Sequence, residues 1–233
     1  MSTTGSYRVY RAAALVVKPS MHVWFRMRIE GAAQVPATGP VILACNHRSN
    51  VDPVLLASAI RRPVTFMAKA ELFVGPLRWI LNAIEQFPVR RGGIDREALR
   101  DCAAVLGRGG VLGLFPEGTR GDGRFTTIHP GVAYVVVQQN CPIVPVAIFG
   151  TERVRRRFGW LPWAAPVRIV FGAPFQLPDP EADPGPGDGG ARAARRAATD
   201  QLGRLLREFL ERVERQRRRR DGHDADTDIL TNQ

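Results

Sequence analysis

Residues 41–53 read VILACNHRSNVDP, an apolar run followed by a polar turn and a proline. The first five residues have the length and composition of a buried strand, so this strand is expected to end just before His47. Pro53 suits the first turn of a helix, and Asp52 suits the position that caps it. A strand that leads through a turn into a helix is the repeating unit of a parallel sheet covered by helices.

The turn in this stretch holds a histidine and a carboxylate. Asp52 can accept a hydrogen bond from one ring nitrogen of His47, which leaves the other nitrogen to take a proton. His47 is therefore the candidate general base, and Asp52 is the group that orients it. The alternative is that Asp52 only caps a helix and that His47 is a surface residue, which the spacing alone does not exclude. Ser49 has no nucleophile-elbow pattern around it and is interpreted as a turn residue.

The alternation of apolar runs with helical stretches continues along the chain. Further strands are expected at residues 64–68, 86–89, 111–115, 143–149 and 167–171, and helices at residues 53–60, 76–84, 95–106 and 131–138. This order predicts an α/β fold with a mostly parallel central sheet covered by helices. Such sheets bind ligands at the carboxyl ends of their strands, so His47 and Glu117 are expected to face one cleft.

Composition divides the chain into five segments. Residues 29–177 form the predicted core. Residues 1–28 mix aromatic with basic side chains and predict an amphipathic helix at a lipid interface, although packing on the core explains the pattern equally well. Residues 178–190 are rich in Pro, Gly and Asp and predict an exposed linker. Residues 191–220 predict a basic amphipathic helix, and residues 221–233 predict a disordered acidic tail.

The chain carries a large positive charge. Its 33 Lys and Arg residues against 22 Asp and Glu residues leave a net charge of +11 over 233 residues. Such a chain favours an anionic partner, and composition leaves open phospholipid headgroups, nucleic acid or a phosphorylated substrate. No apolar run reaches the ~18 residues of a membrane-spanning helix. No signal-peptide cleavage region is evident.

Cysteine and histidine spacing indicates no metal or redox site. Cys45, Cys102 and Cys141 follow no metal or redox pattern, and two of them lie in apolar runs, which fits a reducing, cytoplasmic setting. The four histidines are scattered, without a cluster of Cys, Asp or Glu at ligand spacing. A metal is therefore not expected. No phosphate-loop or dinucleotide fingerprint predicts a bound nucleotide.

A second block, residues 115–120, reads FPEGTR and also follows an apolar run. Together with the Asn-His, four residues, Asp arrangement of residues 46–52, it resembles the glycerolipid acyltransferase family typified by lysophosphatidate acyltransferase. Two weaker blocks look like the second and fourth motifs of that family, namely residues 69–73 with 87–91 and residues 143–147. The resemblance covers about residues 29–175. One departure is His129, because many relatives carry a lysine just before the glycine of this helix-opening turn.

The resemblance implies an enzyme that moves a fatty acyl group from acyl-CoA or acyl carrier protein (ACP) to the hydroxyl of a lysophospholipid. Lysophosphatidate, which gives phosphatidate, is the first candidate acceptor. His47 and Asp52 would be the catalytic pair. The residues that the resemblance assigns to the acceptor are Arg90, Glu117, Gly118 and Arg120. No cofactor is expected to be bound, since acyl-CoA or acyl-ACP enters as a co-substrate.

The resemblance and the charge together predict a peripheral protein at the cytoplasmic face of the cell membrane, with both basic ends facing anionic lipid and no nucleic acid partner. Two alternatives remain. One is an acyltransferase for another lysolipid or for a glycolipid acceptor. The other is a non-catalytic basic protein that binds a membrane or nucleic acid, in which the motif blocks are remnants of an enzyme core. The joint presence of the His–Asp spacing and the FPEGTR block favours the enzyme.

Overall fold

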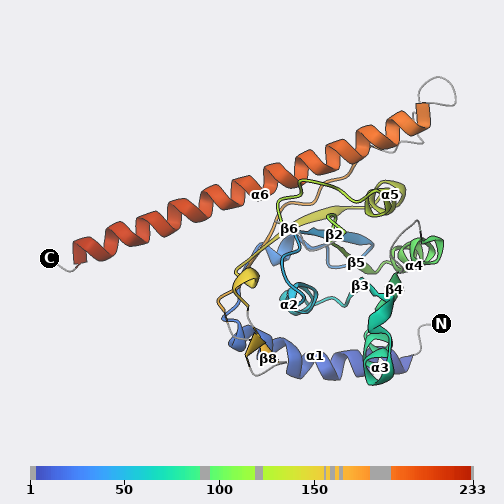
Figure 1. Cartoon of the computed structure of the whole chain (residues 1–233), viewed down its shortest axis with the longest axis horizontal. Coiled ribbons are helices and arrows are strands. Elements are labelled where there is room, and N and C mark those ends of the chain that lie inside the picture. The colour runs from blue at the N-terminus through green and yellow to red at the C-terminus, as the bar shows by residue number, and fades with distance from the viewer. Residues whose placement is uncertain are drawn as a thin grey trace.

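The computed structural model describes residues 4–89, 95–118, 123–154, 156–157, 161–162, 165–178 and 190–231. Within these ranges a seven-stranded sheet forms the centre of the molecule, with the strand order β1-β9-β6-β2-β5-β3-β4 (Figure 1). Its strands are β1 Arg28–Glu30, β2 Val41–Cys45, β3 Val64–Lys69, β4 Phe87–Val89, β5 Val111–Leu114, β6 Ile143–Phe149 and β9 Arg168–Phe171. A separate pair of short antiparallel strands is formed by β7 Arg156–Arg157 and β8 Leu161–Pro162.

Helices connect and flank these strands. The α-helices in the described ranges are α1 Thr4–Trp24, α2 Asp52–Ala59, α3 Gly75–Ala83, α4 Arg96–Gly107, α5 Pro130–Gln138 and α6 Gly190–Thr231. Short 3-10 helices are η1 Ala32–Gln34, η2 Ala70–Leu72 and η3 Thr151–Arg153. The predicted α/β fold with a mostly parallel central sheet is confirmed, and every predicted strand is present with bounds within one residue of the expected positions.

The edge strand β1 has no counterpart in the sequence analysis. It pairs in parallel with β9, with Arg28 opposite Arg168. The guanidinium of Arg168 also forms an ion pair with Glu30 of β1 at 2.8 Å. A strand of three residues is too short to show an alternating pattern, which explains why periodicity missed it. β9 in turn runs antiparallel to β6, so the sheet is mostly but not wholly parallel.

Helices cover both faces of the sheet, which explains why its central strands are apolar throughout. Every residue of β2 and β6 is buried, as expected where neither face of a sheet meets water. On one face Met21 of α1 packs against a core that includes Leu55 and Leu56 of α2. The second core, on the other face, takes its helical residues from α4, α5 and α6. α1 and α6 therefore lie on opposite sides of the sheet (Figure 1).

α6 is longer than the helix predicted for residues 191–220. Its buried positions are Ala198, Leu202, Gly203, Leu206, Phe209, Leu210 and Val213. The helix continues to Thr231, and the disordered acidic tail expected at residues 221–233 stays a prediction. Extending a nucleated helix costs little, and no proline interrupts this stretch. The far end of α6 projects beyond the rest of the molecule (Figure 1). Of the predicted linker, residues 179–189 lie outside the described residues.

The arginine run at residues 217–220 is partly engaged with the body of the protein. The guanidinium of Arg217 lies 5.1 Å from the centroid of the Phe149 ring. Arg220 forms an exposed ion pair with Glu30 at 3.3 Å. Contacts of this kind are weak individually, but they direct part of the charge of the run toward the protein itself.

Candidate active site

His47 and Asp52 form a hydrogen-bonded pair at the carboxyl end of β2. The Nδ1 atom of His47 lies 2.9 Å from the Oδ2 atom of Asp52. The Asp52 side chain is fully buried, whereas 16% of the His47 side chain is exposed. Because Nδ1 is engaged by the carboxylate, Nε2 is the ring nitrogen that remains for a proton from a ligand. The pairing expected from the sequence is therefore present.

Asp52 also holds the turn that carries the histidine. Its Oδ2 atom accepts hydrogen bonds from the backbone N–H groups of Arg48, at 2.8 Å, and Ser49, at 2.7 Å. Three polar groups thus converge on one buried oxygen, which fixes the carboxylate beside the imidazole. The expected capping role is wrong, because Val51 occupies the cap position and Asp52 is the first residue of α2. Its carboxylate binds the preceding turn instead of the helix.

The imidazole is also held by stacked aromatic rings. The Phe115 and His47 rings lie 4.2 Å apart between centroids, with an interplanar angle of 28°. Phe66 stacks on Phe115 at 5.9 Å and 15°. Gly113 of β5 gives this stack its room, because a side chain there would overlap the Phe66 ring. The His47 ring is therefore fixed at its edge by a carboxylate and at its face by an aromatic ring.

Asn46 joins the end of β2 to the end of β6. Its side-chain amide donates to the carbonyl of Ile148 at 3.0 Å and accepts the N–H of Ile148 at 2.7 Å. Asn46 is fully buried, and these bonds fix the strand end from which His47 projects. The sequence analysis gave Asn46 no role beyond its place in the motif. The signal was available, because a buried asparagine must find partners for both polar groups of its amide.

The thiol of Cys45, the last residue of β2, lies fully buried. Burial raises the pKa of its thiol well above the ordinary value, and the carboxylates of Asp52 and Glu117 raise it further. The thiol therefore stays protonated at neutral pH, whereas the thiolate is the reactive form of a cysteine. Two carboxylates from distant motifs act on this one side chain, so the structure brings the two motifs together.

The FPEGTR block begins with a tight turn after β5. The N–H of Gly118 donates to the carbonyl of Phe115 at 2.9 Å, and Gly118 has a φ of 66°. A Cβ atom at Gly118 would come within 2.9 Å of the His129 ring, so both backbone conformation and space require a glycine. Glu117 turns toward the protein, where its Oε1 atom accepts the N–H of Phe125 at 2.8 Å. This hydrogen bond therefore joins Glu117 to Phe125, eight residues further along the chain.

His129, the departure from the family pattern, caps α5. Its Nδ1 atom accepts the N–H of Gly131 at 3.3 Å. Its own N–H donates to the carbonyl of Pro116 at 2.7 Å. A lysine has no acceptor and could not make the first of these bonds. The histidine side chain thus has a structural use as the cap of α5, while its backbone N–H ties the start of this helix to the turn after β5.

Arg48 is a cation in the site that the sequence analysis did not single out. Its Nη1 atom lies 3.8 Å from the Oε2 atom of Glu152. Its side chain also lies against Gly123, where any Cβ atom would overlap the guanidinium. Arg48 therefore extends from the turn after β2 to contact both Gly123, after β5, and Glu152, after β6. The signal in the sequence was its place inside the first motif, next to the histidine.

Four of the predicted site residues belong to the described part of the chain. They are His47, Asp52, Glu117 and Gly118, and they follow two neighbouring strands, β2 and β5, that pair in parallel. Arg90 and Arg120, the predicted phosphate ligands, lie outside the described residues. Among the described residues, no three His, Cys, Asp or Glu side chains are grouped as a metal site.

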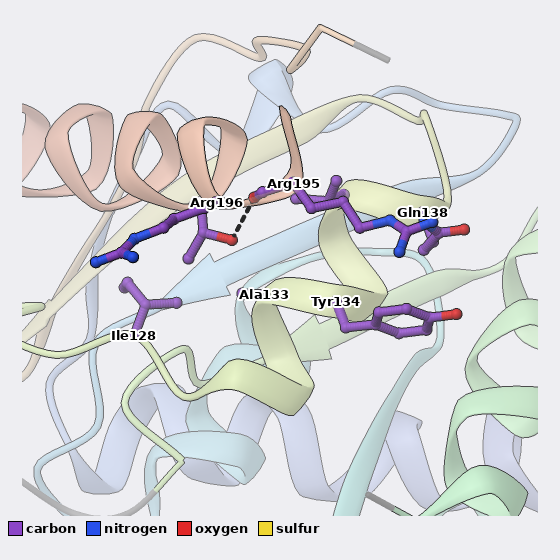
Figure 2. A pocket seen from close by; sticks show the side chains of 8 residues that line it. Ile128, Ala133, Tyr134, Gln138, Arg195 and Arg196 are labelled. Atoms are coloured by element: carbon purple, nitrogen blue, oxygen red, sulfur yellow. Dashed lines mark hydrogen bonds between the residues drawn. The ribbon is translucent and has the colours of Figure 1, made fainter. Parts of the chain in front are cut away.

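A pocket of about 220 Å³ lies elsewhere, between α5 and α6 (Figure 2). Its lining residues are Ile128, Ala133, Tyr134, Val137, Gln138, Arg195, Arg196 and Thr199. None of them belongs to the His–Asp pair or to the FPEGTR block. Apolar side chains of α5 form one wall, and the first turns of α6 form the other. The N-terminal turns of α6 therefore leave a space between themselves and α5.

These observations place the chain in a class of α/β proteins. In this class a histidine–aspartate pair lies at the end of a central strand, and a tight turn containing a glycine follows the neighbouring strand. A family model described as Acyltransferase matches residues 26–149, more than half of the chain. The chain belongs to this family. The matched range contains the His–Asp pair, the aromatic stack and the FPEGTR block.

Relatives with named activities share this range. The chain is 28% identical over 147 residues to the chloroplastic 1-acyl-sn-glycerol-3-phosphate acyltransferase LPAT1 of Arabidopsis thaliana, which covers 61% of this chain and 41% of that protein. It is 25% identical over 175 residues to the 1-acyl-sn-glycerol-3-phosphate acyltransferase of Bacillus subtilis, covering 73% and 84% respectively. The chain thus spans about two-fifths of the plant protein and most of the bacterial one.

A solved structure shares the fold. The 1-acyl-sn-glycerophosphate acyltransferase PlsC from Thermotoga maritima superimposes with a TM-score of 0.65 at 21% sequence identity, covering 90% of this chain and 81% of that chain. At this identity the likeness concerns the fold, and it extends well beyond the matched family range into the C-terminal part of the chain.

Proposed function

We propose that this chain transfers a fatty acyl group from a thioester donor to the hydroxyl of a lysophospholipid, with lysophosphatidate as the first candidate acceptor. The observation that carries the proposal is the His47–Asp52 pair, with its 2.9 Å contact at the carboxyl end of β2. Membership of the acyltransferase family and the activities named for two relatives support the reaction and the acceptor. Acyl-CoA and acyl-ACP are the two donors under this proposal, and no bound cofactor takes part.

In the proposed mechanism, Nε2 of His47 takes the proton of the acceptor hydroxyl as its oxygen attacks the thioester carbonyl. The C–O bond forms and the C–S bond breaks, and the leaving thiolate recovers the proton from the imidazolium. Asp52 stabilises that imidazolium and holds the ring tautomer. The products are the acylated acceptor and a free thiol, so atoms and charge balance without an added reagent.

The acceptor side is proposed to use both charge and shape. Arg90 and Arg120 would bind the phosphate, because a guanidinium offers paired donors that match phosphate oxygens. The role of Glu117 and Gly118 in binding the acceptor stays a prediction from the family resemblance. The hydrogen bond from Phe125 to the Glu117 carboxylate supports a role in shaping the loop. A carboxylate in direct contact with a phosphate dianion would be repelled by it.

The reaction is tested with purified protein, a fixed acyl-CoA and a panel of acceptors: lysophosphatidate, lysophosphatidylethanolamine, lysophosphatidylglycerol and a lipid without phosphate. We expect the highest kcat/KM with lysophosphatidate, and a loss of nearly all of this activity in His47→Ala. A parallel series with acyl-ACP identifies the donor. Absence of product with every acceptor and both donors would contradict the proposal, and product from another lysolipid alone would correct the acceptor.

We also propose that the protein lies on the membrane through α1 and α3. These helices pack against each other, and their solvent-facing apolar side chains include Leu15, at 78% exposure, and Trp79, at 80%. Val16, Val23 and Trp24 of α1 are exposed as well. A large apolar patch of this kind marks a surface that meets another apolar phase. No helix in the described residues combines the length and the apolar content needed to cross a bilayer.

Only one of the two basic ends can face a flat bilayer at a time. α1 and α6 lie on opposite sides of the sheet (Figure 1), which supports contact through one end in place of the expectation that both ends face lipid. We therefore place α6 on the aqueous side. Cosedimentation with anionic vesicles should fall severalfold in a Leu15→Asn, Trp79→Asn double variant and stay within about twofold in Arg218→Gln, Arg219→Gln. The reverse pattern would assign the membrane contact to α6.

A further inference from the structure

Phe125 lies after the FPEGTR block and is held by hydrogen bonds from two sides. On one side, the N–H of Phe125 donates to the Glu117 Oε1 atom at 2.8 Å. On the other side, the Nη1 atom of Arg207, in α6, donates to the carbonyl oxygen of Phe125 at 3.0 Å. Both backbone polar groups of Phe125 are therefore used by side chains, one from the FPEGTR block and one from the C-terminal helix.

Phe125 needs this support because of its backbone conformation. Its φ is 56°, in the left-handed region that a bulky residue seldom adopts. Its side chain is fully buried, in the same core as the apolar stripe of α6. A strained residue persists where surrounding contacts over-determine it, and such residues cluster at functional sites. The two hydrogen bonds and the buried ring are contacts of this kind.

A glycine of α6 lies next to the Arg207 side chain. Gly203 precedes Arg207 by one turn on the same face of the helix. A Cβ atom at Gly203 would come within 3.1 Å of the Arg207 Nη1 atom and within 3.3 Å of Ile128 Cγ1. The absence of a side chain at this position therefore leaves space in which the guanidinium and the loop lie together. The same helix leaves a pocket open one to two turns earlier, at Arg195 and Thr199 (Figure 2).

We propose that Arg207 is a positioning residue for the acceptor side of the site. It holds the Phe125 carbonyl, and through Phe125 it sets the position of the Glu117 carboxylate. The expected effect on acceptor kinetics rests on the proposed function. Arg207 itself contacts no reacting group, and its effect is therefore expected in the use of the acceptor and not in the proton transfer at His47.

The test compares Arg207→Ala and Arg207→Lys with Arg204→Ala as the matched control. Arg204 lies in the same helix, carries the same charge and is exposed. We expect Arg207→Ala to lower kcat/KM for lysophosphatidate about tenfold, mainly through KM, with the KM for acyl-CoA unchanged. Arg207→Lys keeps one donor and should recover part of the loss. An Arg207→Ala enzyme whose acceptor kcat/KM is within twofold of the control would overturn the proposal.

A second measurement needs no turnover. Amide hydrogen exchange of a peptide that spans residues 115–130 should rise in Arg207→Ala and stay unchanged in Arg204→Ala, with the strands of the sheet equally protected in both. Unchanged exchange in the loop, or a uniform rise over the whole chain, would overturn the proposal. If the wild-type protein forms no product with any acceptor, the proposed reaction fails, and the exchange result still decides the role of Arg207.

Discussion

The turn between β2 and α2 and the loop between β5 and α5 lie at the same edge of the sheet, but they are held in different ways. In the turn, the Asp52 carboxylate contacts groups no more than five residues away. In the loop, the chain of contacts runs from Glu117 to Phe125 and on to Arg207, 82 positions further along the chain. The Asp52 hydrogen bonds are therefore local, although Asn46 and Phe115 also brace the histidine from neighbouring strands, whereas Phe125 depends on the docking of a distant helix.

This difference separates the two tasks that we propose for the site. Proton transfer depends on the His47–Asp52 contact, which hydrogen bonds within the turn and the ring of Phe115 hold, so changes in α6 should leave it largely intact. Recognition of the acceptor depends on a loop whose shape is set by the rest of the fold. Variants in the turn should therefore change kcat, and variants around the loop should change the KM for the acceptor.

The largest effect is expected from His47→Ala. General-base catalysis supplies up to about 10⁴-fold, so kcat should fall by a factor of this order. The free energy of unfolding should change little, because the carboxylate keeps its two backbone donors. Steady-state kinetics with a thermal melt as the folding control checks this. Turnover of half the wild-type value or more would remove the base from the mechanism.

The second effect concerns Asp52. Asp52→Asn can still accept the N–H groups of Arg48 and Ser49 but lacks the charge that stabilises the imidazolium, so kcat should fall about 10²-fold with modest loss of stability. Asp52→Ala leaves two N–H groups without their partner, at a cost of roughly 1–3 kcal/mol each where they are buried. Urea unfolding of both variants measures the difference, and equal stabilities would show that these bonds do not hold the turn.

A smaller effect is expected at Gly118. Gly118→Ala places a Cβ atom against the His129 ring in a left-handed conformation, which should cost about 1–2 kcal/mol and raise the acceptor KM severalfold. Gly107→Ala is the matched control, because it meets nothing within 4 Å and has an ordinary φ. Its stability should stay within about 0.5 kcal/mol of the wild type. Equal losses in the two variants would contradict the role of the tight turn.

The smallest effect should come from Glu117→Gln. The amide oxygen of glutamine can accept the same hydrogen bond from Phe125, so a residue that only closes the loop tolerates this change. We expect kcat/KM for the acceptor within about threefold of wild type, and a larger loss in Glu117→Ala, which removes the acceptor atom. A fall in kcat as large as that of the Asp52 variants would instead make Glu117 an acid/base group.

The same contrast explains what the sequence could predict. The strands were found because buried central strands are continuous apolar runs, and the His47–Asp52 contact was found because its partners are neighbours in the chain. The three-residue strand β1 leaves no periodic signal, so periodicity did not predict it. The contacts of Phe125 could not be predicted, because nothing in the sequence near Phe125 indicates a left-handed conformation or a partner in α6.

The hydrogen bond from Arg207 starts outside the range that matches the acyltransferase family, residues 26–149, and ends on a main-chain carbonyl inside it. Every residue has a main-chain carbonyl, so this hydrogen bond does not depend on which side chain residue 125 carries. Under our proposal, selectivity for the acceptor can therefore be inherited separately from the chemistry. Under the same proposal, a change confined to the C-terminal helix would alter the use of the acceptor while leaving every motif residue as it was.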